Sequence, residues 1–277
     1  MKNPLRKRLL RELKSEFGKY LVIFLLLAGT ISLVSGFLVA DGSMIIAYNE
    51  GFEKYNIEDG NFRLGEKANK AQRKAIQELG VTVYDLFYAE EALTNGSTLR
   101  IYQDRDQVDL VCLMKGAMPT TADEIAIDRM YADNNRLTIG DTLESGARSW
   151  TVTGLVALPD YSCLFRDNND SMFDAVKFGV AIVTPEMFED FSKDELYWNY
   201  AWKYDVKPAE GKPEQDAAED LMQGILNEAE LKNFIPTYQN QAIQFTGDDM
   251  GGDKAMMVIL LYIVILIMAF VFGITTS

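Results

Sequence analysis

The strongest candidate for chemistry in the sequence is an oxygen-rich cluster at residues 167–170. Asp167, Asn169 and Asp170 carry the carboxylate and amide oxygens that calcium prefers. An EF-hand loop beginning at Asp167 would need glycine at its sixth position and glutamate at its twelfth, where this chain has Met172 and Phe178. We therefore interpret the cluster as a solvated loop and predict no metal site.

Patterns for catalysis and nucleotide binding are missing from the sequence. There is no histidine, which is the commonest general base and metal ligand. There is no GxSxG motif for a nucleophile and no GxxxxGK[ST] loop for phosphates. Serine, lysine and carboxylate side chains are present, but no motif assembles them. We predict no catalytic residues, no cofactor and no enzymatic activity, so any ATP hydrolysis would belong to a partner.

An aromatic band at residues 197–204 has two interpretations. It could be a surface that faces a substrate or lipid headgroups, or a strand that packs alternate rings into a core. The second is favoured because the band lies well before the nearest hydrophobic run. The band comprises Tyr197, Trp198, Tyr200, Trp202 and Tyr204.

Two cysteines, Cys112 and Cys163, could form a disulfide, but two cysteines do not make a disulfide framework. Cys112 falls in the apolar run 108–114 and Cys163 in a polar, loop-like stretch. Buried thiols are therefore the favoured interpretation.

Two long runs without charged residues enclose the parts just described, at 20–40 and 255–277. A helix of roughly 20 residues crosses the ~30 Å hydrocarbon core of a bilayer. Both runs are therefore predicted transmembrane helices, and 41–254 lies on one side of the membrane. A cleaved signal peptide is the alternative for the first run. That run exceeds the usual length of a signal core, and Leu38-Val39-Ala40 is a weak cleavage site, so a retained anchor is favoured.

Charge sets the predicted orientation. Residues 1–19 carry seven basic and two acidic side chains, which leaves 20 basic and 39 acidic ones for 41–254. By the positive-inside rule the basic arm stays in the cytoplasm and the acidic domain lies outside, in a bacterial cytoplasmic membrane. The acidity also argues against a nucleic-acid partner.

Within the arm, Leu5, Leu9, Leu13 and Phe17 recur every four residues among basic side chains. This predicts an amphipathic helix over 1–19 that lies in the lipid interface. In the first run, small residues also recur every four positions, which favours close packing against another helix. They are Ala28, Ser32, Gly36 and Ala40.

The segment 41–254 is predicted to be α+β. The first helix is predicted to continue over 41–55. Two β-α-β units are predicted, one near each end of the segment. The units are strand 61–64, helix 67–79 and strand 81–88, and then strand 202–206, helix 213–231 and strand 237–245. A mainly-β subdomain is inserted at about 93–194. Its predicted strands are 98–102, 108–113, 124–127, 141–144, 150–157 and 180–184, with a short helix at 128–134.

One stretch carries a family resemblance. EIAIDRMYADNNRLTIGDTLE, followed by WTVTGLVALPDYS, covers 124–162 and resembles the outer domain of FtsX-like permeases of ABC transporters, called the MacB-like periplasmic core. The basic arm with the first run, and the second run from Gly247, resemble the same family in order. The matching positions are Glu124, Ala126, Asp128, Ala132, Gly140, Asp141, Val152 and Gly154. Their residue types suit caps, turns and a core, so we expect structural roles for them.

The resemblance implies a permease subunit that works with a cytoplasmic P-loop ATPase and with a second permease copy or homologous half. Such permeases have further membrane spans after a cytoplasmic loop, so we expect this chain to be an N-terminal portion. The alternative is a two-span membrane-anchored sensor or polysaccharide chain-length regulator that acts by protein interaction. A sensor would need a cytoplasmic output module, and a chain-length regulator a proline-rich stretch before the second span, where only Pro236 lies nearby.

Overall fold

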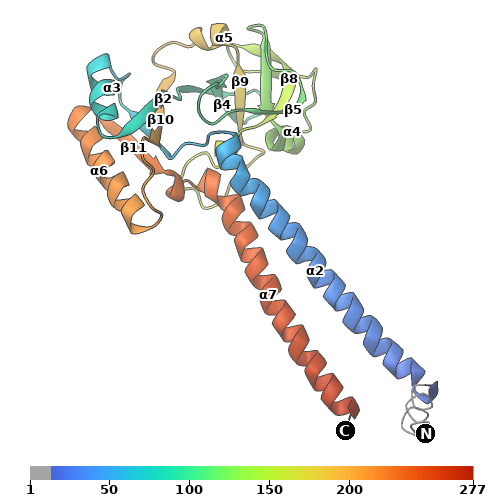
Figure 1. Ribbon diagram of the computed structural model, residues 1–277. Helices are drawn as coiled ribbons and strands as arrows, with labels where there is room; N and C mark the ends of the chain where they lie inside the picture. Colours follow the sequence, from blue (N-terminus) through green and yellow to red (C-terminus); the bar gives the residue numbers. More distant parts are fainter. Residues whose placement is uncertain (1–13, 277) are drawn as a thin grey trace. The chain divides into compact units, whose positions relative to one another are not determined.

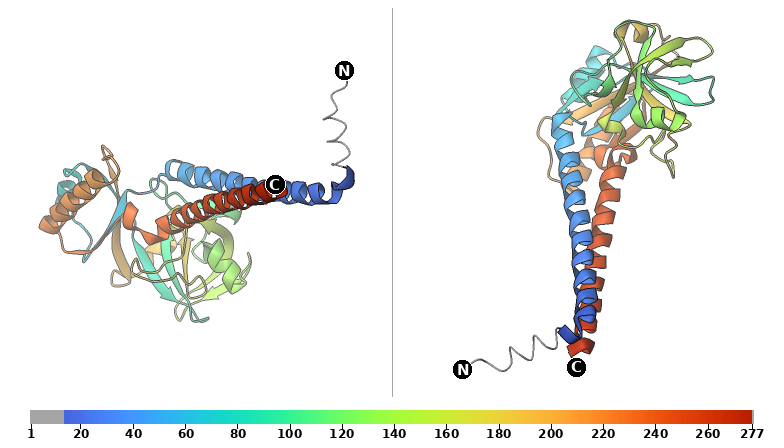
Figure 2. Two further views of the ribbon diagram at one scale, coloured as in Figure 1. Left: turned by 90° about the horizontal axis from the view of Figure 1, so that it is seen from below. Right: turned by 90° about the vertical axis from the view of Figure 1, so that its right-hand side faces the viewer.

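Two long helices contain the two hydrophobic runs. α2 (Phe17–Lys54) and α7 (Gln241–Thr276) are each continuous in the computed structural model, which describes residues 14–276 (Figures 1 and 2). Their most apolar windows have mean hydropathies of 2.5 and 2.3, and only 6% and 0% of these windows is buried within the protein. By length and composition both helices can therefore cross a membrane. Most of the predicted arm helix, 1–19, lies outside the described residues.

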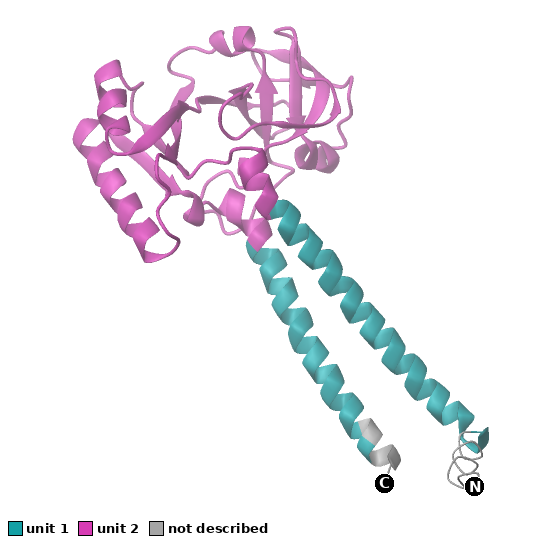
Figure 3. Cartoon of the chain, viewed as in Figure 1, with its two compact units in different colours: residues 1–48, 248–277 teal, residues 49–247 magenta. Residues whose placement is uncertain are grey.

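The chain divides into two units, one made of residues 1–48 and 248–277 and the other of residues 49–247 (Figure 3). The second unit contains the whole sheet. Its strands form one path, β11-β1-β10-β3-β4-β9-β6-β8-β5, with β2 paired to β10 and β7 paired to β8.

The first part of this sheet, here called the helix-covered half, contains both predicted β-α-β units. Its neighbouring strands are all antiparallel, in the order β11-β1-β10-β2. Each helix connects two parallel strands that are separated by a third, which is the split β-α-β arrangement. The elements are β1 (Gly60–Leu64), α3 (Lys70–Gln77), β2 (Val81–Asp85), β10 (Leu196–Tyr204), α6 (Lys212–Glu228) and β11 (Leu231–Pro236).

Alternation along the strands explains why the helices cover only one face of this half. Phe62 in β1 and Tyr200 and Trp202 in β10 are 0–1% exposed and form one apolar cluster with Leu221 and Ile225 of α6. The intervening residues of each strand point to the opposite face. In α3, Asn69 and Gln72 form the capping box that fixes the helix start.

The strand predicted at 237–245 is wrong. Its residues form the 3₁₀ turn η2 (Thr237–Gln239) and the beginning of α7, and the strand is β11, which ends at Pro236. Tyr238, Ala242 and Phe245 are separated by four and three residues. That spacing is typical of a helix, and the break in alternation was its signal.

The remaining strands form the inserted half. β4 is parallel to β9 and β6 to β8, and the other pairs are antiparallel. The half includes the helices α4 (Arg129–Asn135) and α5 (Pro185–Glu189) and the 3₁₀ turn η1 (Pro159–Tyr161). The strands are β3 (Tyr88–Ala92), β4 (Thr98–Gln103), β5 (Cys112–Gly116), β6 (Glu124–Asp128), β7 (Thr142–Glu144), β8 (Ser149–Ala157) and β9 (Phe178–Val183).

Five of the six strands predicted in this half are confirmed within two residues at each end. Asp128 caps α4 as expected, because its carboxylate accepts the backbone N–H groups of Met130 and Tyr131 at 2.7 and 3.1 Å. The strand predicted from residue 108 begins only at Cys112. Asp109 has a φ of 50°, which lies outside the extended region that a strand requires.

Two apolar helices thus flank an α+β domain in which a mainly-β part is inserted into a β-α-β part, as the sequence predicts. The two halves share β10, which pairs with β1 and β2 and also, through Leu196 and Tyr197, with β3.

Candidate functional site

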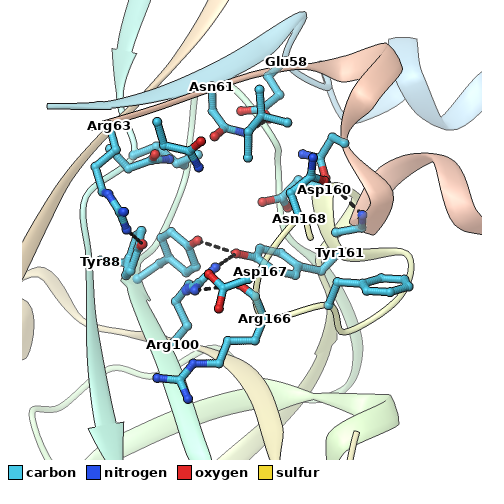
Figure 4. A pocket seen from close by; sticks show the side chains of 18 residues that line it. Glu58, Asn61, Arg63, Tyr88, Arg100, Asp160, Tyr161, Arg166, Asp167 and Asn168 are labelled. Carbon is cyan, nitrogen blue, oxygen red and sulfur yellow. Dashed lines mark hydrogen bonds between the residues drawn. The ribbon is translucent and has the colours of Figure 1, made fainter. Parts of the chain in front are cut away.

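A polar pocket lies between the helix-covered half and the inserted half, within the unit 49–247 (Figure 4). Its volume is about 70 Å³. One wall comes from β1, β10 and β11, and the other from β3, β4, η1 and the loop that follows η1. Its polar lining includes Asn61, Arg63, Tyr88, Arg100, Tyr161, Asn199 and Asn233.

The first wall is the sheet face that the helices leave uncovered. Arg63 of β1 lies opposite Asn199 of β10 and opposite Asn233 of β11, so three polar residues stand in one row across three strands. Because side chains alternate along a strand, this row points away from Phe62 and Leu64, which are buried toward α6.

The second wall is a hydrogen-bonded set around Arg100. Its guanidinium donates to Glu90 at 2.7 Å, to the hydroxyl of Tyr161 at 2.8 Å and to the carbonyl of Arg166 at 3.0 Å. Arg166 also donates to Glu90, at 2.7 Å. Figure 4 shows Arg100 and Tyr161 joined below the opening, and Arg63 and Tyr88 joined at its side. The two arginines share one carboxylate, whose pKa they lower although burial opposes this.

A buried charge network of Glu58, Arg105, Asp109 and Asp160 adjoins the pocket, and Glu58 and Asp160 line it. Arg105 donates to Asp160 at 2.7 Å, and both side chains are 5% exposed. The carboxylate of Asp109 accepts the backbone N–H of Glu58 at 2.9 Å. Glu58 accepts the amide of Asn61 at 2.6 Å and so connects the network to the pocket.

Donors and acceptors of this network are both left without hydrogen-bond partners. Seven buried side-chain atoms among the described residues have no hydrogen-bond partner, and four of them belong to Glu58, Arg105 and Asp109. Burial, together with the charge of Asp160, raises the pKa of Asp109 to about 7. Burial and the charge of Asp109 raise the pKa of Glu58 well above its usual value. Both carboxyls therefore bind protons more readily than exposed ones.

Chemically, this arrangement suits binding. Arginine, asparagine and tyrosine side chains of the lining offer hydrogen bonds to a ligand. Among residues 14–276 no group of three histidine, cysteine or acidic side chains could hold a metal ion.

The structure places the predicted oxygen-rich cluster in a loop at the pocket's edge. Asp167 lines the pocket, and its backbone N–H donates to Asp170 at 3.0 Å, whereas Asn169 is exposed. Between them, Asn168 accepts the backbone N–H of Gln241 at 2.8 Å and donates to the carbonyl of Gln239 at 2.9 Å. The loop therefore holds the beginning of α7 against the rest of the unit 49–247.

The aromatic band is β10, and its alternate rings do enter a core. Tyr200 and Trp202 are 1% and 0% exposed, and Trp198 packs edge-on against Phe87 with ring centroids 5.0 Å apart. Tyr197, on the other face, is 38% exposed and stacks on Tyr88 at 4.7 Å. The structural interpretation of the band is confirmed for the even-numbered positions.

The two cysteines are thiols in the structure. Cys112 is half-buried, and its sulfur accepts a hydrogen bond from the hydroxyl of Tyr55 at 3.1 Å. Cys163 is 5% exposed and lies 3.6 Å from the hydroxyl of Thr246.

Sequence reasoning missed the row of Asn199, Arg63 and Asn233. The available signal was polar alternation, because Asn61 and Arg63 alternate with Phe62 and Leu64 in β1. A second signal was the single asparagine, Asn199, inside an aromatic strand. That these strands are neighbours in this register could not be read from the sequence.

No protein-family model matches the chain, and no curated protein matches it. Solved structures that are similar to the chain include the following two. The extracellular domain of the noncanonic ABC-type transporter YknZ from Gram-positive bacteria is 13% identical, with a TM-score of 0.32, covering 62% of this chain and 100% of that one. The periplasmic region of MacB from Actinobacillus actinomycetemcomitans is 11% identical, with a TM-score of 0.34, covering 68% and 91%.

Proposed function

We propose that this chain is the membrane-spanning, non-ATPase subunit of an ABC transporter, a permease that couples a partner ATPase to an extracytoplasmic domain. The observation that carries the proposal is the position of the two apolar helices at either end of a 49–247 unit with its own sheet and core. The ordered resemblance of the arm, the 124–162 segment and the second run to FtsX-like permeases supports it.

In this proposal the amino terminus and the basic arm lie in the cytoplasm, and the acidic unit lies outside a bacterial cytoplasmic membrane. The charge difference between residues 1–19 and 41–254 supports this orientation. Residues 41–254 would then form the extracytoplasmic domain, between spans at 20–40 and 255–277.

The proposal assigns ATP hydrolysis to a separate P-loop subunit, because the sequence has no phosphate-binding loop of its own. The two helices would transmit movement between that subunit and the outer domain, which requires contacts that differ between two states. A second permease copy or homologous half would pack on the small-residue face of α2, where Ser32, Gly36 and Ala40 are exposed.

Co-purification tests the proposal. The tagged full-length protein is cross-linked in native membranes, extracted in mild detergent and analysed by mass spectrometry. An unrelated two-span protein with the same tag is the control for non-specific capture. We expect a P-loop ATPase to be enriched only with this protein. Repeated recovery of the protein without any ATPase would contradict the assignment.

A further inference from the structure

The pocket contains one cation that no carboxylate neutralises. Arg63 donates to the hydroxyl of Tyr88 at 3.2 Å, and its guanidinium lies 5.4 Å from the ring centroid of Tyr197. Among the ion pairs of residues 14–276, Arg63 has none, whereas the other pocket arginines, Arg100 and Arg166, both pair with Glu90. The remaining N–H groups of Arg63 are therefore available to a ligand.

Next to this cation is an amide side chain that lines the pocket. Asn199 is 8% exposed and lines the pocket, and no hydrogen bond of its side chain occurs among the described residues. Its backbone carbonyl is occupied by the N–H of Leu86, at 3.0 Å. The amide of Asn199 is not among the side-chain groups that are fully buried without a partner, so it is open to the pocket, where a ligand can hydrogen-bond to it in place of water.

The acidic residues of the pocket do not cancel the charge of Arg63. Asp160 is paired with Arg105 at 2.7 Å. Burial raises the pKa of Glu58, which favours its neutral form. Asp167 is exposed to solvent at the edge. In Figure 4, Arg63 lies on the opposite side of the opening from Asp160, Asn168 and Asp167.

We propose that this pocket binds a carboxylate, which accepts from the guanidinium of Arg63 and from the amide of Asn199. A planar guanidinium matches the two oxygens of a carboxylate. Arg63 is the pocket arginine that has no carboxylate partner among residues 14–276, so the carboxylate of a ligand can supply one. The pocket volume of about 70 Å³ is room for roughly five water-sized positions, which suits a small acid or the end of a chain.

Two sources could present this group: a free small carboxylic acid, or the terminal carboxylate of a peptide outside the cell. The two are distinguished by titrating the full-length protein in lipid nanodiscs, by calorimetry, with sodium acetate and with the tripeptide Gly-Gly-Ala. Sodium chloride at equal ionic strength and the amidated tripeptide are the reference ligands. We expect acetate or the free tripeptide to bind saturably. The amidated tripeptide should bind at least tenfold more weakly.

Substitutions test whether the carboxylate binds in the pocket. Arg63→Gln should weaken carboxylate binding by at least about tenfold, because a charge-assisted pair is lost. Arg136→Gln is the matched control: it removes the same charge from an exposed position outside the pocket lining and should leave the affinity unchanged. Asn199→Ala should weaken binding several-fold, which keeps the test decisive if Arg63→Gln fails to fold.

Acetate binding indicates a free acid as ligand, and binding of the peptide alone indicates a chain terminus; both support the proposal. Equal binding of the acid and the amide, equal effects of Arg63→Gln and Arg136→Gln, or no response beyond chloride would each overturn it. The titration contains no ATPase, so its failure leaves the permease proposal untouched, and loss of the ATPase partner leaves the pocket untouched.

Discussion

Arg105 and Asp160 form an ion pair in the interior of the unit 49–247, with Nη1 and Oδ1 2.7 Å apart and both side chains 5% exposed. Arg105 also lies over the ring of Tyr102, at 4.1 Å from its centroid. The pair joins the loop after β4 to η1, at the back of the pocket. A buried charge that loses its partner cannot be resolvated, which makes this pair a sensitive point of the fold.

Replacing Arg105 with methionine should therefore destabilise the protein. The change leaves Asp160 buried and unpaired, and we expect the free energy of unfolding to fall by about 3–5 kcal/mol. Denaturant unfolding followed by tryptophan fluorescence measures it. The control is Arg129→Met, which breaks an exposed pair with Asp133 at 55% and 61% exposure and should cost about 0.5 kcal/mol or less. Similar losses for both variants would contradict the role given to burial.

Asp109 should make stability depend on pH. Its pKa is about 7 in the folded protein, against a model-peptide value of 3.8, so the folded state binds the proton more tightly than the unfolded state. The contribution of Asp109 to the free energy of unfolding is therefore fully present below pH about 4 and is lost as the pH rises toward 7. The groups facing it are Glu58, Asp160, Arg105 and Lys203.

Asp109→Asn tests this dependence. Asparagine can still accept the N–H of Glu58 and suits the left-handed backbone at this position, where φ is 50°. We expect the variant to match the original protein at pH 4 and to be the more stable one at pH 8, by a few kcal/mol. Asp123→Asn is the control. The exposed carboxyl of Asp123 has a lowered pKa, so this variant should be less stable than the original protein at neutral pH. Parallel curves for Asp109→Asn and the original protein would refute the prediction.

The two thiols should differ in reactivity. Cys112 is half-buried and Cys163 is 5% exposed, so a maleimide should modify Cys112 first in the folded protein. After denaturation without a reductant, a thiol assay should find two thiols per chain. Finding none would mean that the two cysteines are joined, contrary to the structure.

Labelling of intact cells tests the proposed orientation. In a background of Cys112→Ser and Cys163→Ala, Val206→Cys places a thiol at a position where the original side chain is 86% exposed. An impermeant maleimide should label it from outside, and should label Lys14→Cys only after the membrane is permeabilised. If only Lys14→Cys were labelled in intact cells, the orientation would be the opposite of the proposed one.

Local pattern predicted most elements of the fold. The capped helix after Asp128 and the strand with Tyr200 and Trp202 are fixed by neighbours in sequence, through capping and alternation. The strand predicted at 237–245 failed because the prediction passed over the break in its alternation. The partner that places the strand at 231–236 instead, β1, is far away in sequence.

The pocket could not be predicted for a different reason. Arg63, Asn199 and Asn233 are brought together by the pairing of β1 with β10 and β11, across up to 170 residues of chain. Charges such as Glu58 and Asp160 also look solvated in the sequence, and only the insertion of one half into the other buries them.

β10 has a consequence for how the unit 49–247 unfolds. Its nine residues, Leu196–Tyr204, are hydrogen-bonded to β1 and β2 over most of their length and to β3 at the amino-terminal end. Neither half can unfold without breaking the hydrogen bonds between its strands and β10. The unit should thus show one cooperative thermal transition, with the amide protons of β10 among the slowest to exchange with deuterium.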